Sequence, residues 1–426
     1  MIDVSAGNDA LKIRYAKGLQ TILLDDEELA PFYADVARKE IGAIGKAFGS
    51  KFHVVLKVGD PETSNTSLSD AKTKAEASTE GGHSRYKEMQ LSPTKRFSAV
   101  SVTGSAWRRS MTDMQSFVKH NSEELDSGLR TLHRALSNTI AGTGSGSRGR
   151  VSSVTTTTVV ITNKADMFKF RVGMEIRVAA AESSGALRTG TGRITHVARH
   201  SKTLTVTGVD PSAQSWQLND YIFAVGDFSA STLTNWLGVG FWIPETVPSA
   251  GSTDASGIDR SSGPELHGHR FDCSGEEDIV DALQAAAADF HDAGMPGSGV
   301  AIYLNPLDMG KISKILQLAK RGDLQAGAGG KGEVIARVGY STVVLSCALG
   351  NLPIISDRTM PQGKAYFLKR SSWCVAYVGK EVVAPIDEDG LIYRKGSGDQ
   401  FTAEMVSESQ LICMRPGENG LAYGLP

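Results

Sequence analysis

Apolar residues alternate with polar ones shortly after residue 50. Phe52, Val54, Leu56 and Val58 lie two positions apart in FHVVLKV, which predicts a strand with one buried face. A second strand-like run, RFSAVSVTG, begins at Arg96. The two runs predict a hairpin.

The segment Asp60–Glu88 between these runs is very polar. It carries ten charged residues, and Leu68 and Tyr86 are its only large apolar side chains. Such a segment has no core of its own and is longer than an ordinary hairpin loop. It is therefore either disordered or ordered by a neighbouring molecule.

The strongest helical pattern covers Ser105–Ala141. Its apolar residues form one stripe at helical spacing: Trp107, Met111, Met114, Val118, Leu125, Leu129, Leu132, Leu136 and Ile140. A continuous helix over this range would be about 55 Å long. Gly128 weakens the helical pattern slightly, and the glycine-rich run 142–150 reads as a linker.

The first fifty residues also have helical spacing, with apolar residues recurring at Leu29, Phe32, Val36, Ile41 and Ile44. The acidic run 25–28 suits a helix N-terminus. We therefore expect a helical arm over residues 1–50.

Residues 151–228 change to short runs rich in Thr, Val and Ile, separated by Gly, Asn, Asp and Ser clusters. Five such runs predict a small β-barrel or sandwich. The chain from about residue 230 then mixes helices with strands, which is α+β organisation.

Local signals give finer predictions in this last part. Ser274 and Glu277 form a capping-box pattern before an alanine-rich helix that ends at Gly294. Asn305 is predicted to cap a second helix, with Pro306 at its first position. The strand-like runs STVVLSC, LPIISD, AYFLKR, WCVAYVG and EMVSESQLICM close the chain.

Composition excludes several classes of protein. The 426 residues include 45 basic and 47 acidic side chains, a net charge of −2, so a histone-like nucleic-acid binder is excluded. No run reaches the ~18 apolar residues of a membrane span, and the N-terminus has no secretory pattern. The cysteines at 273, 347, 374 and 413 form no CxxC pair, which favours a reduced, cytosolic folding compartment.

No catalytic or metal-binding motif is complete. GxGxxG occurs at Gly144, Gly146 and Gly149 and again at 327–332, but neither lies between a strand and a helix. His267, His269 and Cys273 have no evident fourth zinc ligand. The carboxylates at 276–278 suit a helix N-terminus, and Gly322 in the run 321–323 suits a helix end. We predict no enzymatic activity, cofactor or metal.

The order of these parts resembles the major capsid protein of tailed bacteriophages, which has the Hong Kong ninety-seven-type fold. The stretches that carry the resemblance are the helix Ser105–Ala141, GFWIPET at 240–246, YLNPLDMGKI at 303–312 and the closing strands. The resemblance implies an α+β fold with an N-terminal arm, extended loop, long spine helix, and peripheral and axial domains. A small all-β barrel or sandwich would be inserted in it.

On this resemblance we divide the chain into five parts: 1–50 is the arm, 51–103 the extended-loop hairpin, 104–142 the spine helix of the peripheral domain, 143–229 the inserted β domain, and 230–426 the remaining peripheral domain and the axial domain. The extended loop, Lys51–Ser101, would lie over an adjacent subunit. Its expected intersubunit residues are Asp60, Lys72, Lys74, Arg85 and Lys87. Lys12, Arg14 and Lys17 of the arm would face DNA.

The resemblance also implies partners and a location. The subunit would associate with itself in hexamers and pentamers, forming an icosahedral-type shell around double-stranded DNA that it touches weakly and non-specifically. A separate scaffolding protein, a portal and decoration proteins would be further partners, with no membrane contact. Assembly would take place in the cytoplasm of the bacterial host, giving a virion capsid.

Other readings of the sequence stay open. An encapsulin-like compartment protein has the same fold and encloses a cargo enzyme. A binding protein could use the β module to hold carbohydrate. A nucleotide-dependent enzyme is disfavoured, because both glycine runs lack the required context.

Overall fold

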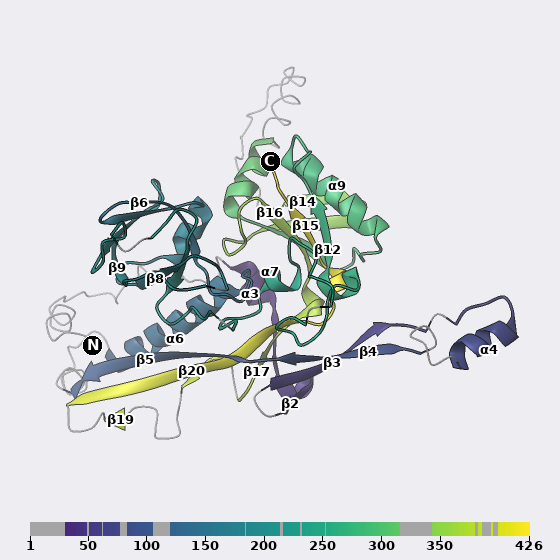
Figure 1. Cartoon of the computed structure of the whole chain (residues 1–426), viewed down its shortest axis with the longest axis horizontal. Coiled ribbons are helices and arrows are strands. Elements are labelled where there is room, and N and C mark those ends of the chain that lie inside the picture. The colour runs from purple at the N-terminus through teal and green to yellow at the C-terminus, as the bar shows by residue number, and fades with distance from the viewer. Residues whose placement is uncertain are drawn as a thin grey trace, which may run out of the picture.

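The structure is a computed structural model that describes residues 30–48, 51–61, 63–76, 83–104, 120–183, 185–213, 216–230, 232–251, 253–315, 343–379, 382–385, 393–394 and 399–426. These residues form a central ribbon, a projecting hairpin, a C-terminal α+β unit and a barrel (Figure 1). The run 105–119 of the predicted long helix lies outside them.

The central ribbon is built from two long antiparallel strands. β5 (Thr94–Thr103) pairs with β20 (Gln400–Cys413) over ten residue pairs, from Thr94 opposite Ser409 to Thr103 opposite Gln400. β20 also pairs with β17 (Trp373–Tyr377), which in turn pairs with β1 (Ala37–Glu40). The short strands β18 (Ala384–Pro385) and β19 (Tyr393–Arg394) complete this sheet.

Helix α6 (His120–Thr139) lies along the ribbon and packs its stripe against it (Figure 1). Leu132 and Leu136 are buried, as the spacing predicted. Gly128 has a structural reason: a Cβ there would lie 2.2 Å from Met405 Cε and 2.9 Å from Val100 Cγ2. The helix approaches the ribbon closely because this position carries no side chain.

In the described part of the arm, the prediction of a helix is wrong after Asp35. Helix α3 (Pro31–Asp35) ends after five residues, and the chain continues as β1, the 3₁₀ turn Ile41–Ala43 and β2 (Lys46–Phe48). Residues 37–40 form a strand because they pair in parallel with β17, which lies far away in the sequence. The spacing of apolar residues within the arm gives no sign of this distant partner. Residues 1–29 lie outside the described part.

A separate three-stranded sheet forms the hairpin. β2 pairs with β3 (Lys51–Gly59), and β3 pairs with β4 (Arg85–Leu91). Phe52, Val54 and Leu56 are buried on one face, which confirms the alternation. The observed hairpin is shorter than the predicted range 51–103. It ends with β4, because β5 pairs with β20 and not with β3.

Residues 149–224 form a closed six-stranded barrel beside α6 (Figure 1). Its strands are β6 (Gly149–Val154), β7 (Thr158–Ile161), β8 (Glu175–Ala179), β9 (Gly192–Ala198), β10 (Thr203–Thr207) and β11 (Tyr221–Ala224). The run VSSVTTTTVVIT supplies two strands where we expected one, because residues 155–157 turn the chain back on itself. Val159, Ile161, Ile176 and Leu204 belong to a core that is the barrel's own.

The C-terminal unit contains a second six-stranded sheet, in the order β12-β21-β16-β13-β15-β14. The strands are β12 (His269–Asp272), β13 (Val300–Leu304), β14 (Val343–Cys347), β15 (Gly350–Ser356), β16 (Lys364–Lys369) and β21 (Gly420–Tyr423). Helix α9 (Ile279–Asp292) packs on this sheet. The sequence did not single out β12 and β21, which are both only four residues long.

Local cap predictions had different outcomes. Asn305 caps the helix that begins at residue 306, because its Oδ1 accepts the N–H of Leu307 at 3.1 Å. The capping box at Ser274 and Glu277 is wrong: α9 begins at Ile279, with Asp278 at the N-cap position. Gly294 has φ 89° and ends α9 as expected.

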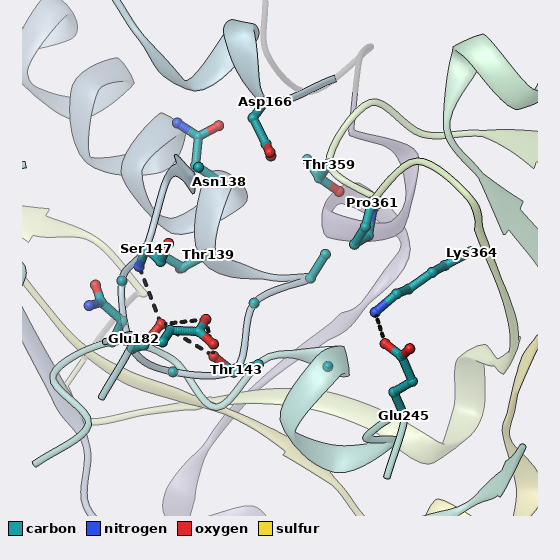
Figure 2. A pocket seen from close by; sticks show the side chains of 18 of the residues that line it. Asn138, Thr139, Thr143, Ser147, Asp166, Glu182, Glu245, Thr359, Pro361 and Lys364 are labelled. Atoms are coloured by element: carbon teal, nitrogen blue, oxygen red, sulfur yellow. Dashed lines mark hydrogen bonds and ion pairs between the residues drawn. The ribbon is translucent and has the colours of Figure 1, made fainter. Parts of the chain in front are cut away.

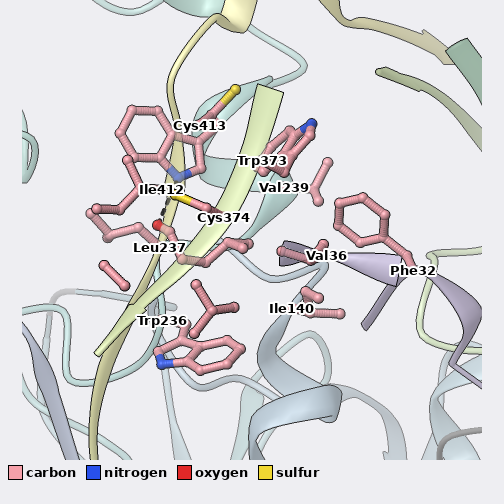
Figure 3. Packing of buried hydrophobic residues seen from close by; sticks show 14 of the residues in the cluster. Phe32, Val36, Ile140, Trp236, Leu237, Val239, Trp373, Cys374, Ile412 and Cys413 are labelled. Carbon is pink, nitrogen blue, oxygen red and sulfur yellow. Dashed lines mark hydrogen bonds between the residues drawn. The ribbon is translucent and has the colours of Figure 1, made fainter. Parts of the chain in front are cut away.

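The central core joins segments from the whole chain. Trp236 and Trp373 are fully buried together with Phe32 (Figure 3). Trp242 is fully buried in the same core. Each indole N–H has a partner, since Trp236 donates to Ser409 O at 3.1 Å, Trp242 to Leu411 O at 3.2 Å and Trp373 to Asn419 Oδ1 at 2.9 Å. Burial is therefore compatible with these polar groups.

Candidate assembly surface

The hairpin β3–β4 is fixed to the body at its base. Its buried residues Phe52, Val54, Met89 and Leu91 belong to the central core. The N–H of Gln90 donates to Ser256 O at 2.9 Å, and the Gln410 side chain donates to Ser92 O at the same distance. The base therefore has a defined direction relative to the body.

Beyond its base the hairpin reaches away from the rest of the chain. It carries helix α4 (Leu68–Glu76) at its far end (Figure 1). None of the α4 residues is buried. At about 3.3 Å per residue, the nine residues of β3 alone span about 30 Å.

Three large apolar side chains on this projection face solvent. Val55 is 64% exposed, Leu68 72% and Tyr86 63%. Val55 is opposite Glu88 and Tyr86 is opposite Lys57, so Val55 and Tyr86 share the face turned away from the buried one. The alternation of FHVVLKV already placed Val55 on this face, but the sequence did not indicate that the face lacks a cover.

The predicted intersubunit residues occupy different parts of the hairpin. Lys72 and Lys74 are exposed on α4. Asp60 forms an ion pair with Lys57. The hydrogen bond that the Lys57 ammonium donates to the Asp60 carboxylate raises the pKa of Lys57. Arg85 is exposed at the start of β4 with its guanidinium against Gly59.

Lys87 has a different environment from the other four residues. Its Nζ donates to the carbonyl of Asp259 in the same chain at 2.9 Å. Lys87 therefore helps to fix the hairpin base to its own body. The arm residues Lys12, Arg14 and Lys17 lie outside the described residues.

A second open face lies on the central ribbon. Phe97 of β5 is 67% exposed and lies opposite Val406 of β20. The next pair on this face, Lys95 and Glu408, forms an ion pair at 3.3 Å. Side chains opposite each other in an antiparallel pair share a face, so this surface is apolar with a charged margin.

The histidine cluster is part of the interior. His267 and His269 are at most 9% exposed, and burial lowers the pKa of each ring. His269 Nε2 lies 3.0 Å from Gly417 O, and His267 Nδ1 lies 2.9 Å from an Arg270 nitrogen. Burial raises the pKa of the Cys273 thiol to about 11. In the described part of the chain, no three His, Cys, Asp or Glu residues are placed to hold a metal ion.

A cavity of about 530 Å³ lies between the barrel and the body (Figure 2). The glycines at 144, 146 and 149 are among the residues that line it. Glu182 Oε1 accepts hydrogen bonds from Thr143 and Ser145, each at 2.9 Å. On the other side, Lys364 pairs with Glu245 at 2.5 Å. These charged groups hold segments of the chain together, and β6 follows the glycines where a dinucleotide site needs a helix.

Within the described residues, no helix has the length and apolar character to cross a membrane. No protein-family model and no curated protein matches the sequence.

Solved structures do match. The chain is similar to a chain of the "Cyanophage A-1(L) capsid asymmetric unit", with a TM-score of 0.55 and 10% identity, over 97% of this chain and 96% of that one. It is also similar to the "Capsid of native GTA particle" (TM-score 0.47, 6% identity, 97% and 95% covered). A third similar chain is from the holo-SrpI encapsulin complex of Synechococcus elongatus PCC 7942 (TM-score 0.45, 8% identity, 100% and 96% covered).

The cyanophage likeness extends over nearly the whole of both chains. It confirms the expected α+β fold of the Hong Kong ninety-seven type. At 10% identity it establishes the fold alone.

Proposed function

We propose that this chain is the major capsid protein of a tailed bacteriophage, a structural protein without catalytic activity or cofactor. Copies associate in hexamers and pentamers and tile a shell around double-stranded DNA in the virion, after assembly in the bacterial cytoplasm. The observation that carries the proposal is the hairpin: its base is fixed in the core, while Val55, Leu68 and Tyr86 are exposed beyond it. The capsid fold supports the same role.

Exposed apolar residues on a projecting element favour contact with another protein surface. A hairpin that buries none of its tip helix gains stability when a second copy covers it. Each contact of standard size buries about 800 Å² per partner, and many such contacts add up over a shell. The hairpin therefore supplies one of the repeated contacts of the lattice.

The remaining predicted parts belong to the same proposal. Asp60, Lys72, Lys74 and Arg85 would form the charged margin of the hairpin contact, with Lys87 fixing its base. Lys12, Arg14 and Lys17 would face the DNA. The barrel would be an insertion in the capsid fold, and a separate scaffolding protein, a portal and decoration proteins would complete the particle.

The test replaces the two apolar residues on the open hairpin face. We expect Val55→Ser with Tyr86→Ser to keep a folded subunit and to reduce shell formation at least about tenfold, since two buried apolar side chains contribute ~1.5–3 kcal/mol each. Sedimentation velocity and negative-stain microscopy measure assembly, and circular dichroism measures folding. Val172→Ser with Leu218→Ser on the barrel is the matched control, because both residues are similarly exposed.

Two outcomes would contradict the proposal. Unchanged assembly of the hairpin variant would exclude this face as a lattice contact. A wild-type chain that stays monomeric at every concentration and with host-cell extract would exclude the capsid role. Shells purified from infected cells that contain an enzyme and no nuclease-protected DNA would indicate a compartment protein instead.

A further inference from the structure

One end of the barrel gathers basic side chains that the capsid proposal does not use. They lie at the start of β6, after β7 and in the β9–β10 turn, and we call them the basic end: Arg150, Lys164, Arg199, His200 and Lys202. The segment 149–228 has nine Lys and Arg against six Asp and Glu, in a chain whose net charge is −2. The basic end is therefore a local feature and not an overall charge excess.

Backbone contacts bring the three segments together. The N–H of Ile161 donates to Lys202 O at 2.8 Å, and Lys202 Nζ donates to Thr162 O at 3.0 Å. The N–H of Thr162 donates in turn to Arg150 O at 2.9 Å. Arg199 and His200 are exposed in the turn between β9 and β10, and Lys164 is exposed two residues after Thr162. The backbone hydrogen bonds of the barrel thus hold these basic side chains at one end.

The carboxylates closest in the sequence and structure already have cations of their own. Asp166 pairs with Lys169 at 2.7 Å, and Asp220 pairs with Arg188 at 3.0 Å. Within the described residues, no carboxylate forms an ion pair with Arg150, Lys164, Arg199 or Lys202. The positive potential of the basic end is therefore not neutralised within the chain, which favours an anionic partner.

The type of anionic partner follows from what surrounds the charges. The side-chain amide of Asn163 is exposed among them, and such groups commonly donate to phosphate oxygens. Across the described part of the barrel no Phe, Tyr or Trp ring is exposed. Arg150 covers the Tyr221 ring with its guanidinium, 4.9 Å from the centroid. Single-stranded nucleic acid is usually bound by stacking on exposed rings. Contact with the phosphate backbone of a duplex requires only positive charges and no exposed rings.

We propose that the basic end of the barrel contacts the phosphate backbone of double-stranded DNA without reading its sequence. The inference rests on the proposed function, because the DNA is the one that the shell would enclose. It adds a contact separate from the N-terminal arm. It also orients the subunit, since the basic end must then face the interior of the particle.

The experiment measures binding of the full-length, unassembled protein to a fluorescent 20-base-pair duplex by anisotropy, between 50 and 300 mM salt. The variant is Lys164→Gln with Arg199→Gln, because both side chains are exposed and neither forms a hydrogen bond or ion pair with another described residue. Each lost phosphate contact lowers the slope of log affinity against log salt by about 0.9. We expect a slope smaller by about two and affinity at 50 mM salt reduced about tenfold or more.

The matched control removes the same charge elsewhere. Arg193→Gln with Lys314→Gln changes one exposed barrel residue outside the basic end and one exposed residue of the helix 306–315. We expect this control to keep the wild-type slope. An equal loss in both variants would overturn the proposal, because it would show a general charge effect.

Two further outcomes also decide the question. If the wild-type slope stays unchanged in Lys164→Gln with Arg199→Gln, the basic end does not contact DNA. If polygalacturonate displaces the duplex at equal charge concentration and the variant loses both ligands equally, the partner is an acidic polysaccharide. Shell formation, read separately by microscopy, tests the capsid role itself, so failure of DNA binding and failure of assembly are distinguishable.

Discussion

The hairpin and the barrel both leave the body of the protein, but only the barrel encloses a core of its own. Twelve residues from Val151 to Ile222 are buried inside the barrel, whereas the buried residues of β3 and β4 belong to the central core. A closed barrel has no free strand edge and pairs its own backbone groups. A two-stranded projection cannot do this and depends on what covers it.

The two regions are also joined to the body differently. The hairpin shares apolar contacts with it, while the barrel is held by a charged joint around Asp227. Arg96 of β5 and Arg148 before the barrel approach Asp227 at 3.2 and 3.1 Å, and burial lowers the pKa of Arg148. The barrel is thus a self-sufficient unit on a polar joint, and the hairpin is an extension of the core.

The largest expected effect tests whether the hairpin base belongs to the body. Phe52→Ala removes a ring that is 1% exposed, and we expect a loss of about 3–5 kcal/mol in the free energy of unfolding. Urea denaturation of the unassembled subunit measures it. Val55→Ala on the opposite face is the control and should cost under about 0.5 kcal/mol. Similar costs for both would remove the distinction between base and open face.

The next effect tests the independence of the barrel. Leu204→Ala empties a fully buried site in the barrel core and should cost about 2–5 kcal/mol. Because this core is separate, we expect hydrogen exchange to accelerate in β6–β11 while β13 and β16 keep their protection. Equal loss of protection in all these strands would show one cooperative unit. Leu218→Ala, at an exposed site, is the matched control.

A smaller effect is expected at the joint. Asp227→Asn keeps the shape of the side chain but leaves Arg96 and Arg148 facing a neutral group, which should cost about 1–3 kcal/mol. We expect faster exchange at the barrel–ribbon junction with an intact barrel core. Asp210→Asn, in an exposed barrel loop, should leave the junction unchanged. Loss of the barrel core in Asp227→Asn would contradict the separation drawn above.

The smallest effect concerns pH at the hairpin root. Burial lowers the pKa of His269, which lines the pocket between β3 and the C-terminal unit. In the unfolded chain the His269 ring titrates at about pH 6.5. Below that pH the unfolded state therefore binds a proton that the folded state does not. The stability supplied by neutral His269 is complete above this pH and falls as pH decreases toward the folded pKa.

The urea midpoint at pH 7.5 and pH 5.5 measures this dependence. His269→Gln should make the midpoint less sensitive to pH, even if it lowers stability at both values. His291→Gln, on the exposed side of α9, is the control. An unchanged pH dependence in His269→Gln would show that this ring does not govern the acid response.

Local patterns in the sequence identified the elements whose partners lie nearby. Alternation gave the buried face of β3, and Asn305 was correctly placed as a helix cap. Helical spacing failed after Asp35, where residues 37–40 are a strand whose partner, β17, is more than 300 residues away. The predicted hairpin was too long for the same reason, because β5 pairs with β20 near the other end of the chain.

The candidate surfaces show the same division. The sequence indicated that 60–88 has too few apolar residues to build a core, and it picked out Leu68 and Tyr86 as the exceptions. It did not indicate that Val55 lacks a cover, that Lys87 bonds to Asp259, or that basic side chains from three segments meet at one end of the barrel. Each of these depends on which distant segments come together.

The sequence by itself therefore determined where strands, caps and polar projections lie, since periodicity and caps act within a few residues. The tertiary structure decided which faces are covered and which charges are neutralised. Burial and ion pairing depend on segments that are far apart in the chain, and no local pattern records which of them will be neighbours.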